Sequence, residues 1–167
     1  MNGGRSARRL VPAFFAFAAL TGCGMFGGMS DLECMERAMY FESNRSSRDG
    51  MVAVGSVVMN RVASRQYPNS VCAVVGQKNQ FARGIMTRKM DARSAPLVRD
   101  AALSVLRGER HPFIGQAQFF HTASYRANYD NMHYVLTTGG NAFYERRRPE
   151  LVTRPYPLPA MEGITGR

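Results

Sequence analysis

The sequence predicts a small α+β domain that is mainly helical. Apolar residues recur at steps of three and four over 32–42, and the segment 51–65 is apolar on most sides, so both are expected to be helices. The aromatic run over 117–125 has the composition of a strand. The chain has 167 residues, enough for one domain with a substantial core but not for two comfortable ones.

The first 22 residues have the pattern of a secretory signal. Three arginines within 5–9 precede an apolar run over 10–20, which is too short to cross a bilayer as a helix. The run ends in Leu-Thr-Gly-Cys, which resembles a bacterial lipobox whose cysteine, Cys23, becomes the lipidated first residue of the mature chain. A secreted protein with a chance cysteine is the simpler alternative. Acyl chains on Cys23 would hold the chain on a membrane. Gly24 then favours the outer membrane of a Gram-negative bacterium, with the domain facing the periplasm.

Export determines how the other cysteines are interpreted. With Cys23 lipidated, Cys34 and Cys72 remain as a pair in an oxidising compartment, and neither lies at a metal-ligand spacing. The sequence therefore favours a disulfide over a zinc site, with two buried free thiols as the alternative.

The formal net charge is +10. Inside a cell such a charge would suggest a nucleic-acid partner, whereas outside it suggests an acidic wall polymer or an anionic membrane face. Because the N-terminal segment indicates export, we expect no nucleic-acid partner.

A Gly-rich tether over 23–30 is expected to join the lipidated cysteine to the domain, which spans 31–146. The first helix of the domain, 32–42, ends where a polar stretch breaks the apolar pattern. Ser47 or Asp49 can then cap the second helix. Since that helix is apolar nearly all round, we expect it in the middle of the domain.

Pro68 and Asn69 indicate a turn before a short buried segment. The polar stretch 76–93 is expected to be a loop, with a strand pair within it as one option. The third helix, 94–109, has a serine cap, a proline in its first turn and a glycine past its last turn.

After the strand-like aromatic run, the segment that begins at Asn141 closes the domain at residue 146. The remaining 147–167 are Pro-rich, and we expect them to form an unpacked tail. The chain contains no internal repeat and no second apolar span.

The apolar stripe of the first helix ends on a glutamate. Leu32, Met35 and Met39 share one face, and Glu42 is the next position on it. In one interpretation Glu42 turns outward and pairs with Arg45 or Arg48, an interaction worth under about 1 kcal/mol. In the other it is partly buried, so that desolvation raises its pKa. A carboxylic acid still protonated near neutral pH is what glycosidic bond cleavage needs.

Several short motifs follow one another in order along the chain. They are A-x-Y-x-E at 38–42, G-x-x-A-V-x-x-V-x-x-N-R-V at 50–62, Y-P-x-[ST]-V at 67–71, the Q-F pair at 80–81, F-F-H at 119–121 and a stretch similar to G-x-H-x-F-Y at 139–144. In this order they closely resemble the SleB-like cell wall hydrolase family, named after the catalytic domain of the spore-cortex-lytic enzyme. The resemblance covers 32–146, nearly the whole mature domain.

The resemblance implies a lysozyme-like fold that cleaves peptidoglycan glycan strands in the manner of a lytic transglycosylase, between N-acetylmuramic acid and N-acetylglucosamine. It implies that Glu42 is the catalytic general acid and then the general base, since the muramyl C6 hydroxyl supplies the nucleophile. One carboxylate then suffices, and no metal or other cofactor is expected. Hydrolysis with retention or inversion would need a second carboxylate, for which Asp130 is the reserve candidate.

The candidates for substrate contacts either occupy motif positions of the family or are aromatic residues that could stack on sugar rings. The former are Gln80, Phe81, His121 and Tyr144, and the latter are Tyr125 and Tyr129. Each also has a structural alternative, because aromatic residues fill cores and a histidine can satisfy a buried carbonyl.

The chain departs from the family pattern at four positions. Asn141 stands where the family often has histidine, and Ala127 and Tyr129 replace a common proline and tryptophan. Asn79 stands where many relatives have another cysteine. The first three lie on the expected substrate side, so they bear on specificity and turnover.

Two other functions are compatible with parts of the sequence. A catalytically weak or inactive lipoprotein could bind peptidoglycan with the same fold and tether the outer membrane to the wall. A metal-dependent amidase would need a pairing such as H-E-x-x-H, which His111, His121 and His133 do not form.

Overall fold

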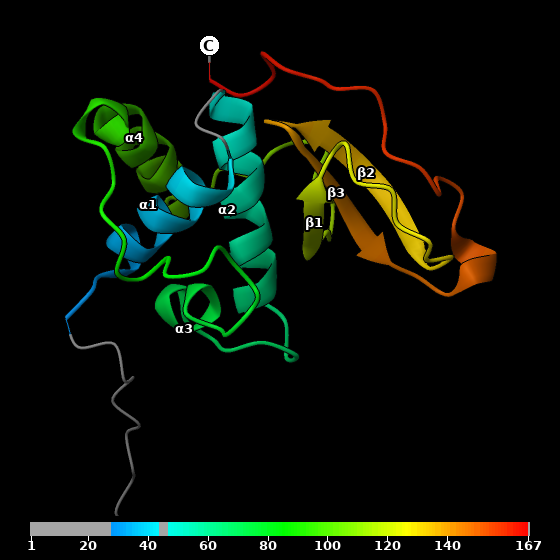
Figure 1. Cartoon of the computed structure of the whole chain (residues 1–167), viewed down its shortest axis with the longest axis horizontal. Coiled ribbons are helices and arrows are strands. Elements are labelled where there is room, and N and C mark those ends of the chain that lie inside the picture. The colour runs from blue at the N-terminus through cyan, green and yellow to red at the C-terminus, as the bar shows by residue number, and fades with distance from the viewer. Residues whose placement is uncertain (1–27, 44–46, 167) are drawn as a thin grey trace, which may run out of the picture.

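The structure is a computed structural model and describes residues 28–43 and 47–166. Its helices are α1 Asp31–Glu42, α2 Arg48–Val62, α3 Val71–Val75 and α4 Ala95–Leu106, its strands are β1 Phe119–Thr122, β2 Met132–Thr138 and β3 Asn141–Arg146, and its 3₁₀ turns are η1 Ala92–Ser94 and η2 Pro149–Leu151. The helices form one part of the molecule and the sheet lies beside them, next to α2 (Figure 1). The predicted class, α+β and mainly helical, is confirmed.

The predicted signal segment 1–22, Cys23 and the tether as far as residue 27 lie outside the described residues. They therefore remain predictions. Within the described part of the chain, no helix has the length and apolar character to cross a membrane.

The first helix forms as its sequence pattern predicts. Ser30 caps α1 because its hydroxyl accepts a hydrogen bond from the Glu33 amide, while the Glu33 carboxylate accepts one from the Ser30 amide. Met35 and Met39, on the predicted apolar stripe, are fully buried. The helix ends at Glu42, as predicted, with its apolar face against α2.

Of the two cap candidates for α2, the structure uses Ser47, whose hydroxyl accepts a hydrogen bond from the Gly50 amide at 3.1 Å. The helix therefore begins three residues before the predicted 51–65 and ends three residues earlier. It is buried on most sides and packs against α1, α3 and α4, which confirms its predicted place in the middle of the domain.

Two glycines let the start of α2 touch the turn between β2 and β3. A Cβ atom on Gly50 would lie 2.7 Å from the Cα of Gly139, and one on Gly139 would lie 2.5 Å from the Cα of Gly50. Gly139 also has a φ of +55°, a conformation that glycine adopts without strain. The sheet thus meets the helices backbone to backbone beside the end of α1, where Ser43 O lies 3.4 Å from the same Cβ position.

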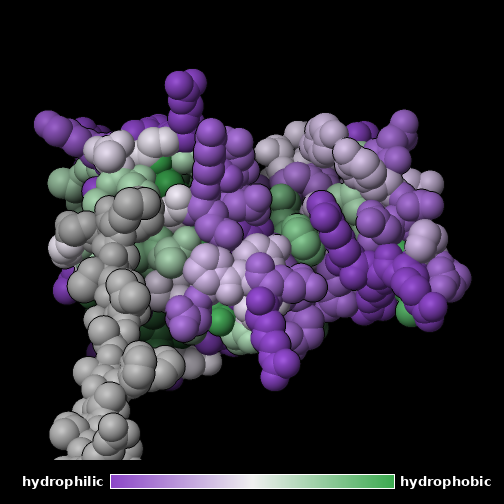
Figure 2. All heavy atoms as spheres, turned by 90° about the horizontal axis from the view of Figure 1, so that it is seen from below, coloured by the Kyte–Doolittle hydropathy of each residue, from purple (hydrophilic) through white to green (hydrophobic). Residues whose placement is uncertain are grey.

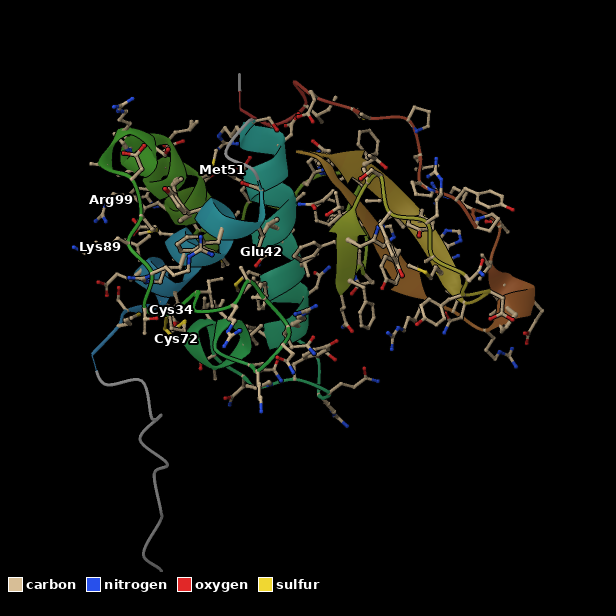
Figure 3. The ribbon with its side chains drawn as sticks, viewed as in Figure 1. Cys34, Glu42, Met51, Cys72, Lys89 and Arg99 are labelled. Atoms are coloured by element: carbon tan, nitrogen blue, oxygen red, sulfur yellow. A yellow bond between two sulfur atoms is a disulfide. The ribbon has the colours of Figure 1, made fainter. Side chains whose placement is uncertain are left out.

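Cys34 in α1 and Cys72 in α3 form the predicted disulfide, with their Cα atoms 5.1 Å apart and a sequence separation of 38. In the chain-entropy account, closing a loop of this length stabilises the fold by about 4 kcal/mol. Figure 3 shows the bond where the first helix crosses the short third one.

The segment between α3 and α4 is a loop of turns, and the strand pair considered for it does not form. Asp91 caps η1 by accepting a hydrogen bond from the Arg93 amide. Ser94 occupies the cap position of α4 but its side chain makes no capping bond, because η1 already leads into the helix. Gly108 ends the helical segment with a φ of +115°, as expected of a glycine past the last turn.

The sheet is antiparallel, in the order β1-β3-β2. Its two faces differ. Phe120, Leu136 and Phe143 pack on the helical core, whereas Tyr134 and Tyr144 lie on the other face. Strand β2 was not predicted from the sequence because all of its residues are buried, so it lacks the alternation that marks a half-exposed strand.

The prediction of an unpacked C-terminal tail is wrong. Arg154 O accepts a hydrogen bond from the Tyr134 amide, and the Met161 amide donates to Thr137 O, both at 2.9 Å. Leu158 packs against the outer face of the sheet. Figure 1 shows this segment running from η2 along β2 back to the start of α2. Prolines prevent a regular ladder, but an extended chain can still satisfy an exposed strand edge.

Candidate active site

Glu42 is the last residue of α1, and its carboxylate faces the loop between α3 and α4 (Figure 3). It is half-buried, and its Oε1 accepts a hydrogen bond from the Ala82 amide. The side chain of Asn141 donates to the backbone carbonyl of Glu42 at 2.6 Å. Glu42 forms no ion pair with the described residues. Of its two candidate partners, Arg48 pairs with Glu109, and Arg45 lies outside the described residues. The structure therefore agrees with the partly buried interpretation.

The environment of Glu42 raises its pKa. Desolvation by burial is the largest cause, since it disfavours the charged carboxylate. The Ala82 hydrogen bond and the positive charge of Arg61 act in the opposite direction but do not cancel it. Burial therefore favours the protonated form of Glu42, while the nearby positive charge of Arg61 stabilises the carboxylate that remains after the proton is donated.

Arg61, near the end of α2, joins three segments around Glu42. Its side chain is 3% exposed, and its Nε donates to Gln118 O at 2.8 Å. The guanidinium carbon lies 5.1 Å from the ring centre of Phe81 and 5.2 Å from that of Tyr67. Burial lowers the pKa of Arg61, and its Nη1 is buried without a hydrogen-bond partner. Arg61 therefore binds a carbonyl and two rings rather than a carboxylate.

The two residues of the Q-F pair have different environments. Phe81 is half-buried, between Arg61 and Phe120, whose ring centre is 6.4 Å away. Gln80 is exposed. The contact to Glu42 comes from the backbone of the next residue, Ala82, which sequence reasoning missed because an amide donor has no side-chain signature.

On the outer face of the sheet, His121 is the centre of an aromatic cluster. Its Nδ1 lies 2.9 Å from Thr122 O and its Nε2 lies 2.7 Å from the Tyr134 hydroxyl. A carbonyl can only accept, so Nδ1 carries a proton and donates it to Thr122 O. Ring centres of Tyr125 and Tyr144 lie 5.3 and 5.7 Å from that of the histidine. Sequence reasoning did not identify Tyr134 as a member of this cluster, because it did not predict strand β2.

The cluster around His121 unites three of the predicted substrate residues. Tyr144 also lies within electrostatic reach of Arg61, which links the cluster to the surroundings of Glu42. Burial is the largest cause of the raised pKa of Tyr144, so its hydroxyl remains protonated.

Tyr129 lies within electrostatic reach of Tyr144 but makes no ring contact with the cluster among the described residues. It is 69% exposed and lines a separate hollow of about 430 Å³ with Asp130, Pro149 and Tyr156. Asp130, the reserve carboxylate, is exposed and forms no ion pair with the described residues. Ala127 lines the same hollow, so two of the family departures fall there, whereas Asn141 holds the backbone of Glu42.

Two hollows adjoin the contacts of Arg61. One, of about 550 Å³, is bounded by the segment 75–87 and includes Phe81 and Ala82. The other, of about 440 Å³, includes Gln118 and the sheet residue Phe119. Figure 2 shows recessed hydrophobic atoms between the helical part and the sheet, with hydrophilic side chains around them.

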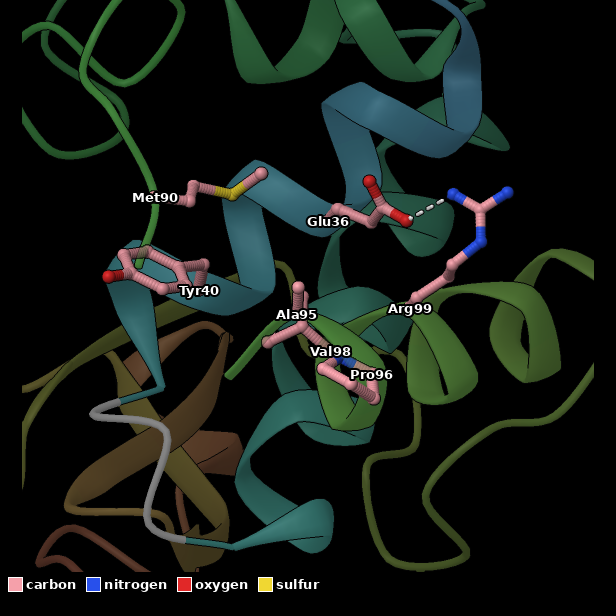
Figure 4. Close-up of a pocket in the computed structure, with 7 residues that line it drawn as sticks. All are labelled: Glu36, Tyr40, Met90, Ala95, Pro96, Val98 and Arg99. Carbon is pink, nitrogen blue, oxygen red and sulfur yellow. Dashed lines mark hydrogen bonds and ion pairs between the residues drawn. The ribbon is translucent and has the colours of Figure 1, made fainter. Parts of the chain in front are cut away.

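A fourth pocket, of about 390 Å³, lies between α1 and α4 (Figure 4). Apolar side chains and an ion pair of 3.0 Å between Glu36 and Arg99 line it. Glu36 precedes Glu42 by six residues, which places it about 120° away around the helix. This pocket therefore opens on a different side of α1.

Histidine does not mark a metal centre in the described segments. No group of three or more His, Cys, Asp or Glu side chains in the described part of the chain could hold a metal ion. His111 is buried, and its Nδ1 accepts from the Phe113 amide, whereas His133 contacts the C-terminal segment through Arg154.

Comparison with known proteins places these features in a family. Residues 45–144 match the family described as Cell Wall Hydrolase, and the match begins three residues after Glu42. The chain is also similar to the spore cortex-lytic enzyme of Bacillus cereus, with 38% identity over 52 residues. That match covers 31% of this chain and 20% of the relative, so the chain matches a fifth of the relative's length.

Two solved structures share the fold. The catalytic domain of the germination-specific lytic transglycosylase SleB from Bacillus anthracis aligns with a TM-score of 0.57 and covers 76% of this chain and 100% of its own. The catalytic domain of the Bacillus cereus SleB protein aligns with a TM-score of 0.59 and covers 74% and 99%. Both are 24% identical to this chain. Because the family match spans more than half of the sequence, the chain belongs to the Cell Wall Hydrolase family.

Proposed function

We propose that this chain cleaves peptidoglycan glycan strands by lytic transglycosylation, with Glu42 as its catalytic carboxylate. The main supporting observation is the environment of Glu42, which is half-buried, has a raised pKa and is held by the Ala82 amide. Family membership and the fold of a lytic transglycosylase catalytic domain support the same substrate class.

In the proposed reaction Glu42 begins protonated and donates its proton to the oxygen between N-acetylmuramic acid and N-acetylglucosamine. The bond from muramyl C1 to that oxygen breaks, and the N-acetylglucosamine end leaves as an alcohol. The Glu42 carboxylate then takes the proton of the muramyl C6 hydroxyl, whose oxygen bonds to C1. The product is a 1,6-anhydro ring, no water is consumed, and Glu42 is protonated again.

The distribution of carboxylates favours this route over hydrolysis with two carboxylates. Glu36 lines the pocket against α4, and Asp49 is buried against the C-terminal segment. Glu145 is paired with Arg147. Among the described residues, none of these groups contacts Glu42, whereas a retaining hydrolase needs a second carboxylate about 5–5.5 Å away.

The hollows that adjoin the contacts of Arg61 suit an extended glycan. Sugar rings pack on aromatic faces, and Phe81 and Phe119 each line one of the hollows. Glu42 contacts the wall of the first hollow through Ala82, so a strand that occupied both would pass close to the proposed acid.

We further propose that lipidated Cys23 anchors the domain to the outer membrane, facing the periplasm. This part rests on the sequence of 1–24 alone. The alternative is a catalytically weak or inactive lipoprotein that binds peptidoglycan and tethers the membrane to the wall.

Product analysis tests the proposal against this alternative. The purified protein is incubated with sacculi, and the released fragments are identified by mass. Muropeptides with anhydromuramyl ends are expected. Hydrated muramyl ends would indicate hydrolysis, and sedimentation with sacculi without any soluble product would indicate the tether.

Arg61→Gln is expected to lower the rate of sacculus cleavage about tenfold, because the loop that bears Ala82 loses a fixed contact. Removing the positive charge also raises the pKa of Glu42 further, since Arg61 lowers it. The alkaline limb of the pH–rate profile, where the acid loses its proton, should therefore move to higher pH. Arg61→Lys is the matched control, because it keeps the charge and should leave the limb in place. An equal shift in both variants would contradict the electrostatic role.

A further inference from the structure

The segment 76–94, between α3 and α4, which we call the basic loop, has an excess of unpaired positive charge. Its basic residues are Lys78, Arg83, Arg88, Lys89 and Arg93, all exposed, and its one acidic residue is Asp91. No ion pair of the described residues involves any of these five cations. The basic loop therefore has a net charge of +4 that carboxylates of the described chain do not neutralise.

The basic loop is fastened to the helix that ends in Glu42. The guanidinium of Arg37 donates to the carbonyls of Ile85 and Arg88, at 2.9 and 2.8 Å. The Tyr40 hydroxyl accepts from the Asp91 amide at 2.7 Å. The cations of the loop are thus presented on a backbone held in place by α1, so little ordering is needed to bind an anion.

Two of the cations border the hollow beside Glu42. Lys78 and Arg83 line the hollow of about 550 Å³ together with Phe81 and Ala82. Arg83 directly follows Ala82, whose amide holds the Glu42 carboxylate. The hollow therefore combines an aromatic wall with two cations, next to the proposed proton donor.

We propose that Lys78 and Arg83 bind the carboxylates of the peptide stems that the glycan strand bears beside the cleaved bond. The inference rests on the proposed function, because it takes that same site to be a glycan site. Peptidoglycan bears peptide stems on its muramyl residues, through a lactyl group, and these peptides have free carboxylates. Arginine binds a carboxylate through a planar fork and lysine binds it as a point charge. The site then favours strands with peptides over bare glycan.

An anionic lipid surface is a different partner for the same charge. A flat bilayer would contact the outer cations of the basic loop equally, whereas Lys78 and Arg83 line a concave hollow that adjoins the residue holding Glu42. The position of these two residues therefore favours the peptide stems, and the lipid surface becomes an outcome of the test.

Binding is measured by sedimentation with sacculi, in the full chain with Glu42→Gln so that cleavage does not consume the substrate. The test variant adds Lys78→Gln and Arg83→Gln. The matched control adds Arg107→Gln and Arg148→Gln, which remove the same charge from exposed positions at the end of α4 and at η2. Each variant is assayed by sedimentation with intact sacculi and by equilibrium dialysis with chitin oligosaccharides, which are soluble glycans that bear neither peptides nor lactyl carboxylates.

The test variant is expected to bind intact sacculi about fivefold more weakly than the control, and the chitin oligosaccharides equally well, as suits two exposed ion pairs. Added salt should reduce the difference on intact sacculi. Equal weakening on both substrates, or none on intact sacculi, would overturn the proposal. Loss of binding to phosphatidylglycerol vesicles with unchanged sacculus binding would also overturn it. Failure of the proposed function itself is separate, because it appears as absence of anhydromuramyl products from the wild-type chain.

Discussion

Glu42→Gln is expected to cleave sacculi at least about 10³-fold more slowly than the wild-type chain. Glutamine keeps the length of the side chain and an oxygen that can accept the Ala82 hydrogen bond, but it has no proton to transfer. The measurement is the rate of release of anhydromuramyl products from purified sacculi, with binding to the sacculi followed in parallel. Binding should persist while release stops.

Glu36→Gln is the matched control for that variant, since it removes a carboxylate from the same helix on a different side. We expect it to retain cleavage. If Glu42→Gln released products at the rate of this control, Glu42 could not be the proton donor.

The raised pKa of Glu42 also predicts how its replacement affects stability. Desolvation is the main cause, so the folded state binds the proton of Glu42 more tightly than the unfolded state does. The stability that this group contributes is present at low pH and is lost as pH rises through the raised pKa. Glutamine has no charge to desolvate, so at pH 7 the variant should unfold at the same temperature as the wild-type chain or a higher one. Loss of cleavage can then be distinguished from loss of fold.

Asp49→Ala is expected to lower the free energy of unfolding by about 3 kcal/mol, because it leaves donors without their charged acceptor. Asp49 is 1% exposed and accepts hydrogen bonds from the Ile164 and Thr165 amides and from the Thr165 hydroxyl. These bonds fasten the C-terminal segment to the start of α2. Denaturant unfolding measures the loss, and faster hydrogen exchange of the two amides would locate it.

The effect of Asp49 should depend on pH. Burial alone would raise its pKa, but the hydrogen bonds from Thr165 and Ile164 outweigh burial and lower it. A lowered folded-state pKa contributes stability above the unfolded value of about 3.9, and this contribution is lost as pH falls through the folded-state pKa. The difference between the wild-type chain and Asp49→Ala should therefore be full near pH 7 and shrink below about pH 4.

Asp100→Asn is the control for Asp49, because Asp100 is an exposed partner of Arg48 and such pairs contribute under about 1 kcal/mol. An Asp49→Ala chain as stable as this control, with unchanged exchange at Ile164 and Thr165, would mean that the C-terminal segment is not fastened through Asp49.

The sequence alone determined the features that depend on local pattern. The period of apolar residues identified α1 and α2 and showed that Glu42 continues the buried stripe of Met35 and Met39. The export signal and the two cysteines that remain after Cys23 predicted the disulfide between Cys34 and Cys72. These features were accessible because helix periodicity, capping and cysteine pairing depend on residue type and spacing.

Only the tertiary structure decided which groups surround Glu42. The Ala82 amide, the side chain of Asn141 and the charge of Arg61 reach it from three other segments. Backbone donors have no sequence signature, and the contacts of a buried arginine depend on which segments fold beside it.

Tertiary structure also decided that β2 forms a strand and that the C-terminal segment packs on the domain. Strand β2 is buried on both faces, so its sequence does not alternate between apolar and polar residues. The Pro-rich segment shows neither the helical period of 3.6 residues nor the strand period of two. Each became ordered through long-range hydrogen bonds, such as those to Tyr134, Thr137 and Asp49. The sequence by itself thus determined the three longer helices and, through the family resemblance, pointed to the proposed acid. Long-range packing decided the sheet, the contacts of the C-terminal segment and the neighbours that set the pKa of that acid.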